Sequence, residues 1–155
     1  MSSLEPPTIH PLLADRAAGV LLHPTSLPST DGAFGIGDLG PTARRFATWA
    51  ADAGLRRWQM LPIGPVGDGD CPYSARSSFA IEPMLTSIAD LVEDGYLPAA
   101  ATRIGREDSA RDDRGRASWR RVRRWKRPLL EAAFRGFRAR RGRMGLRGAA
   151  YEDFR

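Results

Sequence analysis

Two short apolar runs and the amphipathic stretch between them form the first clear pattern along the chain. The run "GVLL" at residues 19–22 is continuously apolar, which is typical of a strand buried on both faces in a parallel sheet. Further on, apolar residues recur at spacings of three and four, as on one helix face: Leu39, Ala43, Phe46, Ala50 and Ala53. Pro41 suits the first turn of this helix, and Gly54 suits its end. A second strand at 58–61 completes a predicted βαβ unit with parallel strands.

Each predicted strand runs into a long loop, and the second loop is the more unusual one. Residues 61–80, "LPIGPVGDGDCPYSARSSFA", combine glycines and prolines with aspartates, a cysteine and a tyrosine. The prolines and glycines exclude a helix and the middle of a sheet. In α/β folds, ligands bind at the carboxyl ends of parallel strands, so this loop is predicted to lie at a substrate site. The alternative is a solvated connection that binds nothing.

The pattern beyond Pro83 predicts two further helical segments. A short helix over 84–95 would turn four apolar residues inward and end at Gly95: Leu85, Ile88, Leu91 and Val92. A longer segment from 119 to 137 has apolar residues at helical spacing, with arginines on the opposite face: Trp119, Val122, Leu130, Ala133, Phe134 and Phe137. Pro128 falls inside it, so we expect a kink there or a second helix that begins at the proline.

These patterns divide the chain into four parts. Residues 1–17 form an N-terminal extension, and 18–98 hold the first βαβ unit with its long substrate-side loops. Residues 99–117 are a polar connection, and 118–155 are a basic helical segment. The predicted fold class is α/β.

Charge is distributed unevenly and raises a second functional hypothesis. The net charge is +6, but residues 1–98 carry −5 and residues 99–155 carry +11, counting histidine as neutral. The run "RRVRRWKR" at 120–127 and the neighbouring tryptophans could bind nucleic-acid phosphates and bases. We favour the simpler interpretation, in which the arginines are the solvated face of a helix and no nucleic acid is bound.

Composition argues against membrane, secreted and metal-binding proteins. No apolar run approaches the roughly 20 residues of a membrane span, and the N-terminus lacks the pattern of a secretory signal. The single cysteine, Cys71, excludes an internal disulfide and fits a reducing cytoplasm. His10 and His23 lie too far apart for a metal-ligand motif. We therefore expect a cytoplasmic protein without a metal or other cofactor.

Three stretches carry a resemblance to a known family: "GVLLHPTSLPS", "GIGDLGPTARRFATWAADAGLRRWQMLPIGPVGDGDCPYSARSSFA" and "WKRPLLEAAFRGF". They closely resemble the N-terminal region of amylomaltases, the 4-α-glucanotransferases also called disproportionating enzymes. The resemblance runs from Ala18 to Leu97 and resumes more loosely from Trp119 to Phe137. It implies the N-terminal part of a (β/α)8 TIM-type barrel with an inserted helical segment, incomplete in this chain because only two of eight strands are evident.

The resemblance also implies an activity. Amylomaltases transfer α-1,4-glucan segments between maltodextrins through a covalent glycosyl-enzyme, with a carboxylate nucleophile and a carboxylic acid/base. In this family those carboxylates lie after later barrel strands, so we expect no catalytic residue in this chain. By themselves, the 155 residues are expected to be an inactive portion of a longer enzyme. A non-catalytic glucan-binding or regulatory module is the alternative.

Carried over residue by residue, the resemblance places two substrate-binding residues in the loop. Tyr73 matches a family tyrosine whose ring lines the sugar site beside the scissile bond, although a packed loop tyrosine is the alternative. Asp70 matches the aspartate of the family's "GD.PY" motif and would orient the loop or a sugar hydroxyl. Cys71 stands where the family usually has serine.

Other polar residues near the loop have simpler explanations. Two of the three carboxylates Asp68, Asp70 and Glu82 could be considered as the catalytic pair, but carboxylates in glycine-rich loops usually bind backbone amides and fix the turn. Three further residues are expected to serve the barrel core or the loop structure: Trp58, His23 and Ser26. "IEP" at 81–83 replaces a common "GNP", so the exit of the loop is expected to differ from that of the family.

Overall fold

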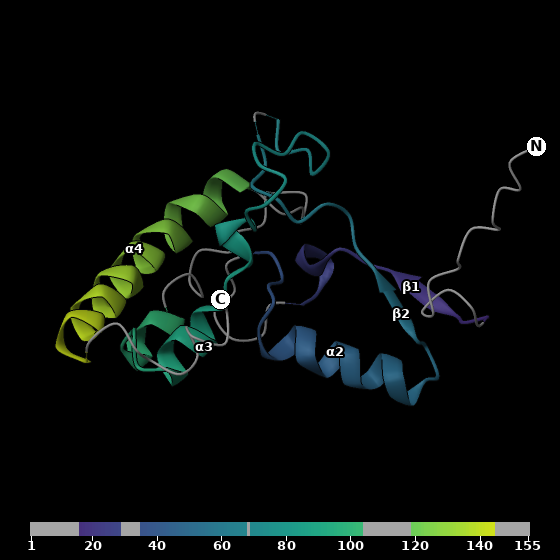
Figure 1. Ribbon diagram of the computed structural model, residues 1–155, viewed down its shortest axis with the longest axis horizontal. Coiled ribbons are helices and arrows are strands. Elements are labelled where there is room, and N and C mark those ends of the chain that lie inside the picture. The colour runs from purple at the N-terminus through teal and green to yellow at the C-terminus, as the bar shows by residue number, and fades with distance from the viewer. Residues whose placement is uncertain (1–15, 29–34, 68, 104–118, 145–155) are drawn as a thin grey trace, which may run out of the picture.

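The computed structural model describes residues 16–28, 35–67, 69–103 and 119–144 (Figure 1). Strand β1 (Gly19–Leu21) pairs in parallel with strand β2 (Arg57–Gln59), with Val20 opposite Trp58. Helix α2 (Pro41–Asp52) connects them, so the predicted βαβ unit is confirmed. The 3₁₀ turn η1 (Pro24–Ser26) follows β1 directly.

Helix α2 packs on the strand pair through aromatic side chains. The rings of Phe46 and Trp58 meet edge to face, with their centroids 4.8 Å apart. The indole nitrogen of Trp58 donates to the carbonyl of Leu22 at 2.7 Å, which ties the end of β1 to β2. Ala43 and Ala50 are buried as the spacing predicts, and Pro41 occupies the first turn.

The predicted burial of the strands on both faces is wrong for the described residues. Val20 and Trp58 are half-buried on the face that α2 covers, whereas Leu21 points to the opposite face and is 58% exposed. Alternation of side chains along a strand means that one helical layer can bury only every second residue. Similarly, Leu39 and Ala53 lie outside α2 and are exposed.

The helix predicted over 84–95 is split in two. The 3₁₀ turn η2 (Pro83–Leu85) is followed by helix α3 (Ile88–Glu93). Ser87 separates them because its backbone is extended and its hydroxyl accepts from the amide of Asp90 at 3.1 Å, which makes it the N-cap of α3. Gly95 ends the segment with φ of +72°, as predicted.

Helix α4 (Trp119–Met144) is one continuous helix through Pro128, so the alternative of a second helix beginning at the proline is wrong. Pro128 and Arg124, four residues earlier, are both exposed, so the helix hydrogen bond that the proline removes belongs to the solvent face of α4. The kink remains a prediction.

Helix α4 lies against α3 and η2 (Figure 1), and two clusters of buried apolar side chains form along it. One cluster joins residues of α3, the segment after it, the 3₁₀ turn η3 (Ala99–Arg103) and α4: Ile88, Leu97, Ala101 and Ala133. A second cluster joins the loop after β1, η2 and α4: Ile36, Met84 and Val122. The predicted stripe on α4 is therefore buried only in part.

Two phenylalanines of the predicted stripe remain accessible. Phe134 is 59% exposed and Phe137 is 38% exposed, because α3 and η3 cover the neighbouring strip around Ala133 instead. Their rings lie 6.5 Å apart, and Phe137 also meets the ring of Tyr96 edge to face.

The predicted boundaries of the four parts stay predictions. Most of residues 1–17 and of the polar connection at 99–117 lies outside the described residues. No helix in the described part of the chain combines the length and the apolar character that crossing a membrane requires.

Candidate functional site

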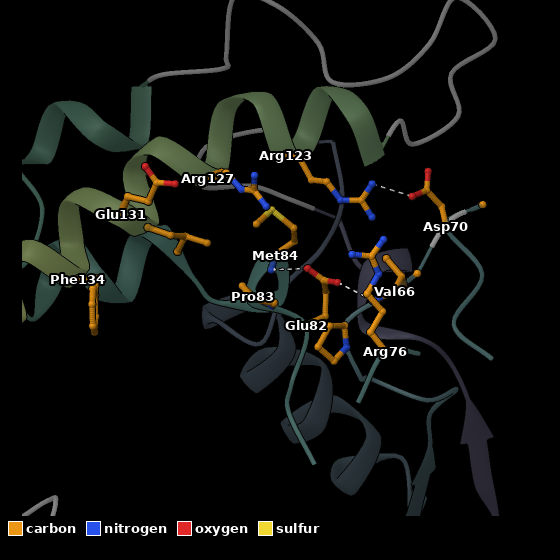
Figure 2. Close-up of a pocket in the computed structure, with 14 residues that line it drawn as sticks. Val66, Asp70, Arg76, Glu82, Pro83, Met84, Arg123, Arg127, Glu131 and Phe134 are labelled. Carbon is orange, nitrogen blue, oxygen red and sulfur yellow. Dashed lines mark hydrogen bonds and ion pairs between the residues drawn. The ribbon is translucent and has the colours of Figure 1, made fainter. Parts of the chain in front are cut away.

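The loop after β2 and helix α4 enclose a cavity of about 880 Å³, which we call the α4 pocket (Figure 2). One wall comes from the loop: Pro65, Val66, Gly67, Gly69, Asp70 and Arg76. The floor comes from η2 and the residue before it: Glu82, Pro83 and Met84. The opposite wall comes from α4: Arg123, Arg127, Leu130, Glu131 and Phe134.

The loop folds back on itself as a short hairpin. An antiparallel bridge joins Val66 to Ala75, and the amide of Gly67 donates to the carbonyl of Ser74 at 3.0 Å. A Cβ on Gly67 would stand 2.6 Å from that carbonyl oxygen, so the close approach of the two chain segments requires glycine. The hairpin raises the loop tip toward α4.

Asp70, at the tip of the hairpin, forms an ion pair with α4. Its Oδ1 lies 2.8 Å from Nη1 of Arg123, and both residues line the α4 pocket (Figure 2). The backbone of Asp70 has φ of +57°, a left-handed conformation that aspartate tolerates better than most residues. The predicted site residue Asp70 thus lines the cavity.

Tyr73 is placed differently. Its side chain is 72% exposed and does not line the α4 pocket. The two predicted substrate-binding residues therefore share a loop but not a cavity wall in the described structure. Both substrate-binding roles remain predictions, and an exposed ring is accessible to a ligand. Cys71, between them, is exposed as a free thiol.

Glu82 has the backbone-fixing role that was the alternative to catalysis. It is 6% exposed and accepts from the amides of Val66 at 2.9 Å and Met84 at 3.1 Å (Figure 2). One carboxylate therefore caps η2 and holds the start of the hairpin, which sets the exit of the loop where the sequence departs from the family pattern. Asp68 lies outside the described residues.

Lys126 makes a buried structural contact that the sequence analysis missed. Its side chain is fully buried, and Nζ donates to Oδ2 of Asp38 at 3.0 Å and to the carbonyl of Met84 at 2.7 Å. Burial lowers the pKa of Lys126, and the charge of Asp38 opposes that effect. The expectation that the whole basic run is solvated is thus wrong at this position. Its spacing could have predicted its burial, because Lys126 lies four residues from both Val122 and Leu130 on the apolar stripe.

His23 structures the turn after β1, as expected. Its Nδ1 accepts from the amide of Thr25 at 3.4 Å and lies 2.7 Å from the Thr25 hydroxyl. Nε2 is buried and has no hydrogen-bond partner among the described residues. Burial lowers the pKa of His23, although the backbone of Pro62 acts in the opposite direction.

The polar groups of the pocket suit a ligand with many hydroxyl groups better than a metal. Arg76, Arg123 and Arg127 bring donors, Asp70 and Glu131 bring acceptors, and the exposed ring of Phe134 adds an apolar surface. Within the described ranges, no group of three or more His, Cys, Asp or Glu side chains is arranged to hold a metal ion.

Comparisons with known proteins agree on one family. A family model described as "4-alpha-glucanotransferase" matches residues 22–155. The 4-alpha-glucanotransferase of Thermus thermophilus is 44% identical over 123 residues, which are 79% of this chain and 22% of that protein. The 4-alpha-glucanotransferase of Synechocystis sp. is 52% identical over 87 residues, 56% of this chain and 17% of that protein. The chain thus spans about a fifth of the length of these relatives.

A solved structure agrees with the sequence relatives. The amylomaltase from Streptococcus agalactiae in complex with acarbose superposes with a TM-score of 0.71 at 31% sequence identity. The superposition covers 84% of this chain and 26% of that one.

Proposed function

Because the chain belongs to the 4-alpha-glucanotransferase family, we propose that it provides the N-terminal strand–helix–strand unit of a (β/α)8 barrel in such an enzyme. The enzyme would transfer α-1,4-glucan segments between maltodextrins in the cytoplasm. Within it, the loop after β2 would form part of the glucan site, and the catalytic carboxylates would come from outside these residues. The acarbose complex of the related amylomaltase supports an α-glucan as the ligand class.

The observation that carries this proposal is the position of the loop after β2. It leaves the carboxyl end of β2, the edge at which parallel α/β folds bind their ligands. Hydrogen bonds at its base and the ion pair at its tip restrain the backbone, while the Tyr73 ring stays accessible. Such restraint limits the ordering cost when a ligand binds.

Tyr73 and Asp70 have distinct roles in this proposal. The Tyr73 ring would cover the apolar C–H face of a glucose unit, and its hydroxyl would hydrogen-bond the sugar. Asp70 would set the shape of the loop tip, because its carboxylate is already engaged by Arg123. No carboxylate of the described loop is assigned a catalytic role, since Glu82 binds two backbone amides.

Kinetics of Tyr73 variants test the proposal. In the complete protein with maltotriose, Tyr73→Ala removes both the aromatic face and the hydroxyl, at an expected cost of about 2 kcal/mol in transition-state stabilisation. Tyr73→Phe keeps the ring and should lose roughly half as much. The loss should appear in kcat and in kcat/KM alike, because the site beside the scissile bond contacts the reacting sugar.

Ser78→Ala, at an exposed position of the same loop, is the matched control and should keep wild-type kinetics. The products to be measured are glucose and longer dextrins. Wild-type kinetics for Tyr73→Ala would show that the tyrosine has no part in the glucan site.

A further inference from the structure

We propose that Arg123 is a positioning residue that holds the carboxylate of Asp70 from helix α4 and thereby fixes the loop that carries Tyr73. The inference rests on the proposed role of this loop in the glucan site. It concerns a residue of the helical segment, 53 positions away from Asp70 along the chain.

The loop tip has an unusual backbone conformation. Asp70 is the single non-glycine residue with positive φ in the part of the chain that the structure describes. Backbone hydrogen bonds join Gly67 to Ser74 and Arg76 to Pro65, and these bonds restrain the base of the hairpin. At the tip, Gly69 is also left-handed, with φ of +88°. A sparsely populated conformation of this kind persists where its surroundings hold it.

Arg123 is suited to hold the tip because the helix beneath it is anchored. Its neighbour Val122 is fully buried, and Lys126, one turn later, binds Asp38 and the Met84 carbonyl. The Arg123 guanidinium also lies 5.4 Å from the centre of the Trp119 ring, which limits its own freedom. The 2.8 Å contact to Asp70 therefore joins the tip to a fixed point (Figure 2).

The ion pair is expected to act on the loop and not on the stability of the whole protein. Both side chains keep more than a third of their surface exposed, 35% for Arg123 and 39% for Asp70, and such pairs contribute little to folding. A small contribution is enough to shift a local opening equilibrium that involves only the tip.

Hydrogen exchange and kinetics of the complete protein test the inference. Arg123→Gln should raise the exchange rates of amides in residues 66–76 by about two- to fivefold. This is the size of effect expected when an ion pair as exposed as this one is lost. Exchange in α3 and α4 should not change. With maltotriose, KM should rise by at most this factor while kcat stays close to wild type, because KM varies inversely with the fraction of molecules whose loop tip is in place.

Four further variants complete the design. Arg120→Gln removes the same charge from an exposed position of α4 and should leave exchange and KM unchanged. Arg123→Lys keeps the charge and should restore part of both effects. Asp70→Asn tolerates the left-handed backbone but loses the charge, so its effects on exchange and KM should equal those of Arg123→Gln. The double variant Asp70→Asn/Arg123→Gln should show effects no larger than either single variant, because both changes break the same contact.

The two measurements separate the inference from the proposed function. Unchanged exchange of residues 66–76 in Arg123→Gln overturns the inference, as does an equal effect of Arg120→Gln. Faster exchange with unchanged KM, in an enzyme that Tyr73→Ala impairs, overturns the link between the ion pair and substrate binding. If Tyr73→Ala has wild-type kinetics while Arg123→Gln still loosens the loop, the proposed function fails and the ion pair stands.

Discussion

The imidazole of His23 makes the turn after β1 sensitive to protons. In the neutral ring, Nδ1 accepts from the Thr25 amide, so the proton is on Nε2. Protonation would turn Nδ1 into a donor, opposing that hydrogen bond, and would place a charge in a partly buried position. The turn is thus more stable with a neutral ring.

We expect a pH dependence of unfolding that belongs to His23. Its folded-state pKa lies below the ordinary value of 6.5, so between these two values the unfolded chain binds more protons than the folded chain. The free energy of unfolding therefore rises with pH across that window. The contribution of His23 is present above pH 6.5 and is lost as the pH falls from 6.5 through the folded-state pKa. The measurement is the urea midpoint at a series of pH values.

His23→Gln should flatten this part of the profile, because glutamine does not titrate. Identical slopes for the wild type and His23→Gln below pH 6.5 would show that the ring titrates alike in the folded and unfolded states.

Single residues also show how far the sequence allowed prediction. Pro41 and Gly95 obey local rules of helix ends, and both were predicted correctly. Lys126 was not, because a run of basic residues resembles a solvated face although its spacing places it among Val122 and Leu130. The positive φ of Asp70 was not predicted either, because no sequence pattern specifies it at an aspartate.

At the level of elements, α4 is attached through one buried cation as well as through apolar packing. Lys126 connects α4 to the loop after β1 through Asp38 and to η2 through the Met84 carbonyl. The sequence predicts the helix itself from its periodicity. It could not show which elements the helix packs on, because that choice depends on contacts between distant segments.

Lys126→Met is expected to destabilise the complete protein by about 2 to 3 kcal/mol. The change leaves a buried carbonyl without its donor and removes the cation that faces Asp38, whose side chain is 20% exposed and partly compensated by water. Denaturant unfolding measures the loss. Adding Asp38→Asn to Lys126→Met should cost less than the sum of the single changes, because the two groups interact directly.

Arg120→Met is the control for the loss of one cation from α4. It lies at an exposed position, and its cost should stay within about 0.5 kcal/mol. Equal stabilities of Lys126→Met and Arg120→Met would contradict a structural role for the buried amine.

At the scale of the whole molecule, the features that depend on neighbouring residues were predicted from the sequence better than those that depend on distant contacts. The βαβ unit follows from short-range patterns and was predicted with strand ends correct to within two residues. The break at Ser87 and the exposure of Phe134 were not predicted, since the first depends on a cap geometry and the second on which helix strip α3 covers.

The contact between Lys126 and Asp38 joins positions 88 residues apart, and this separation bears on the order of folding. Closing so long a segment loses much chain entropy before any contact compensates for it, so such contacts form late. We therefore expect the Lys126 interaction to be absent from the folding transition state. In stopped-flow measurements with urea, Lys126→Met should speed unfolding by nearly the whole stability change and leave the folding rate almost unaltered. A slower folding rate of matching size would place this contact in the folding nucleus instead. If the contact forms late, the buried lysine slows unfolding and so prolongs the lifetime of the folded state.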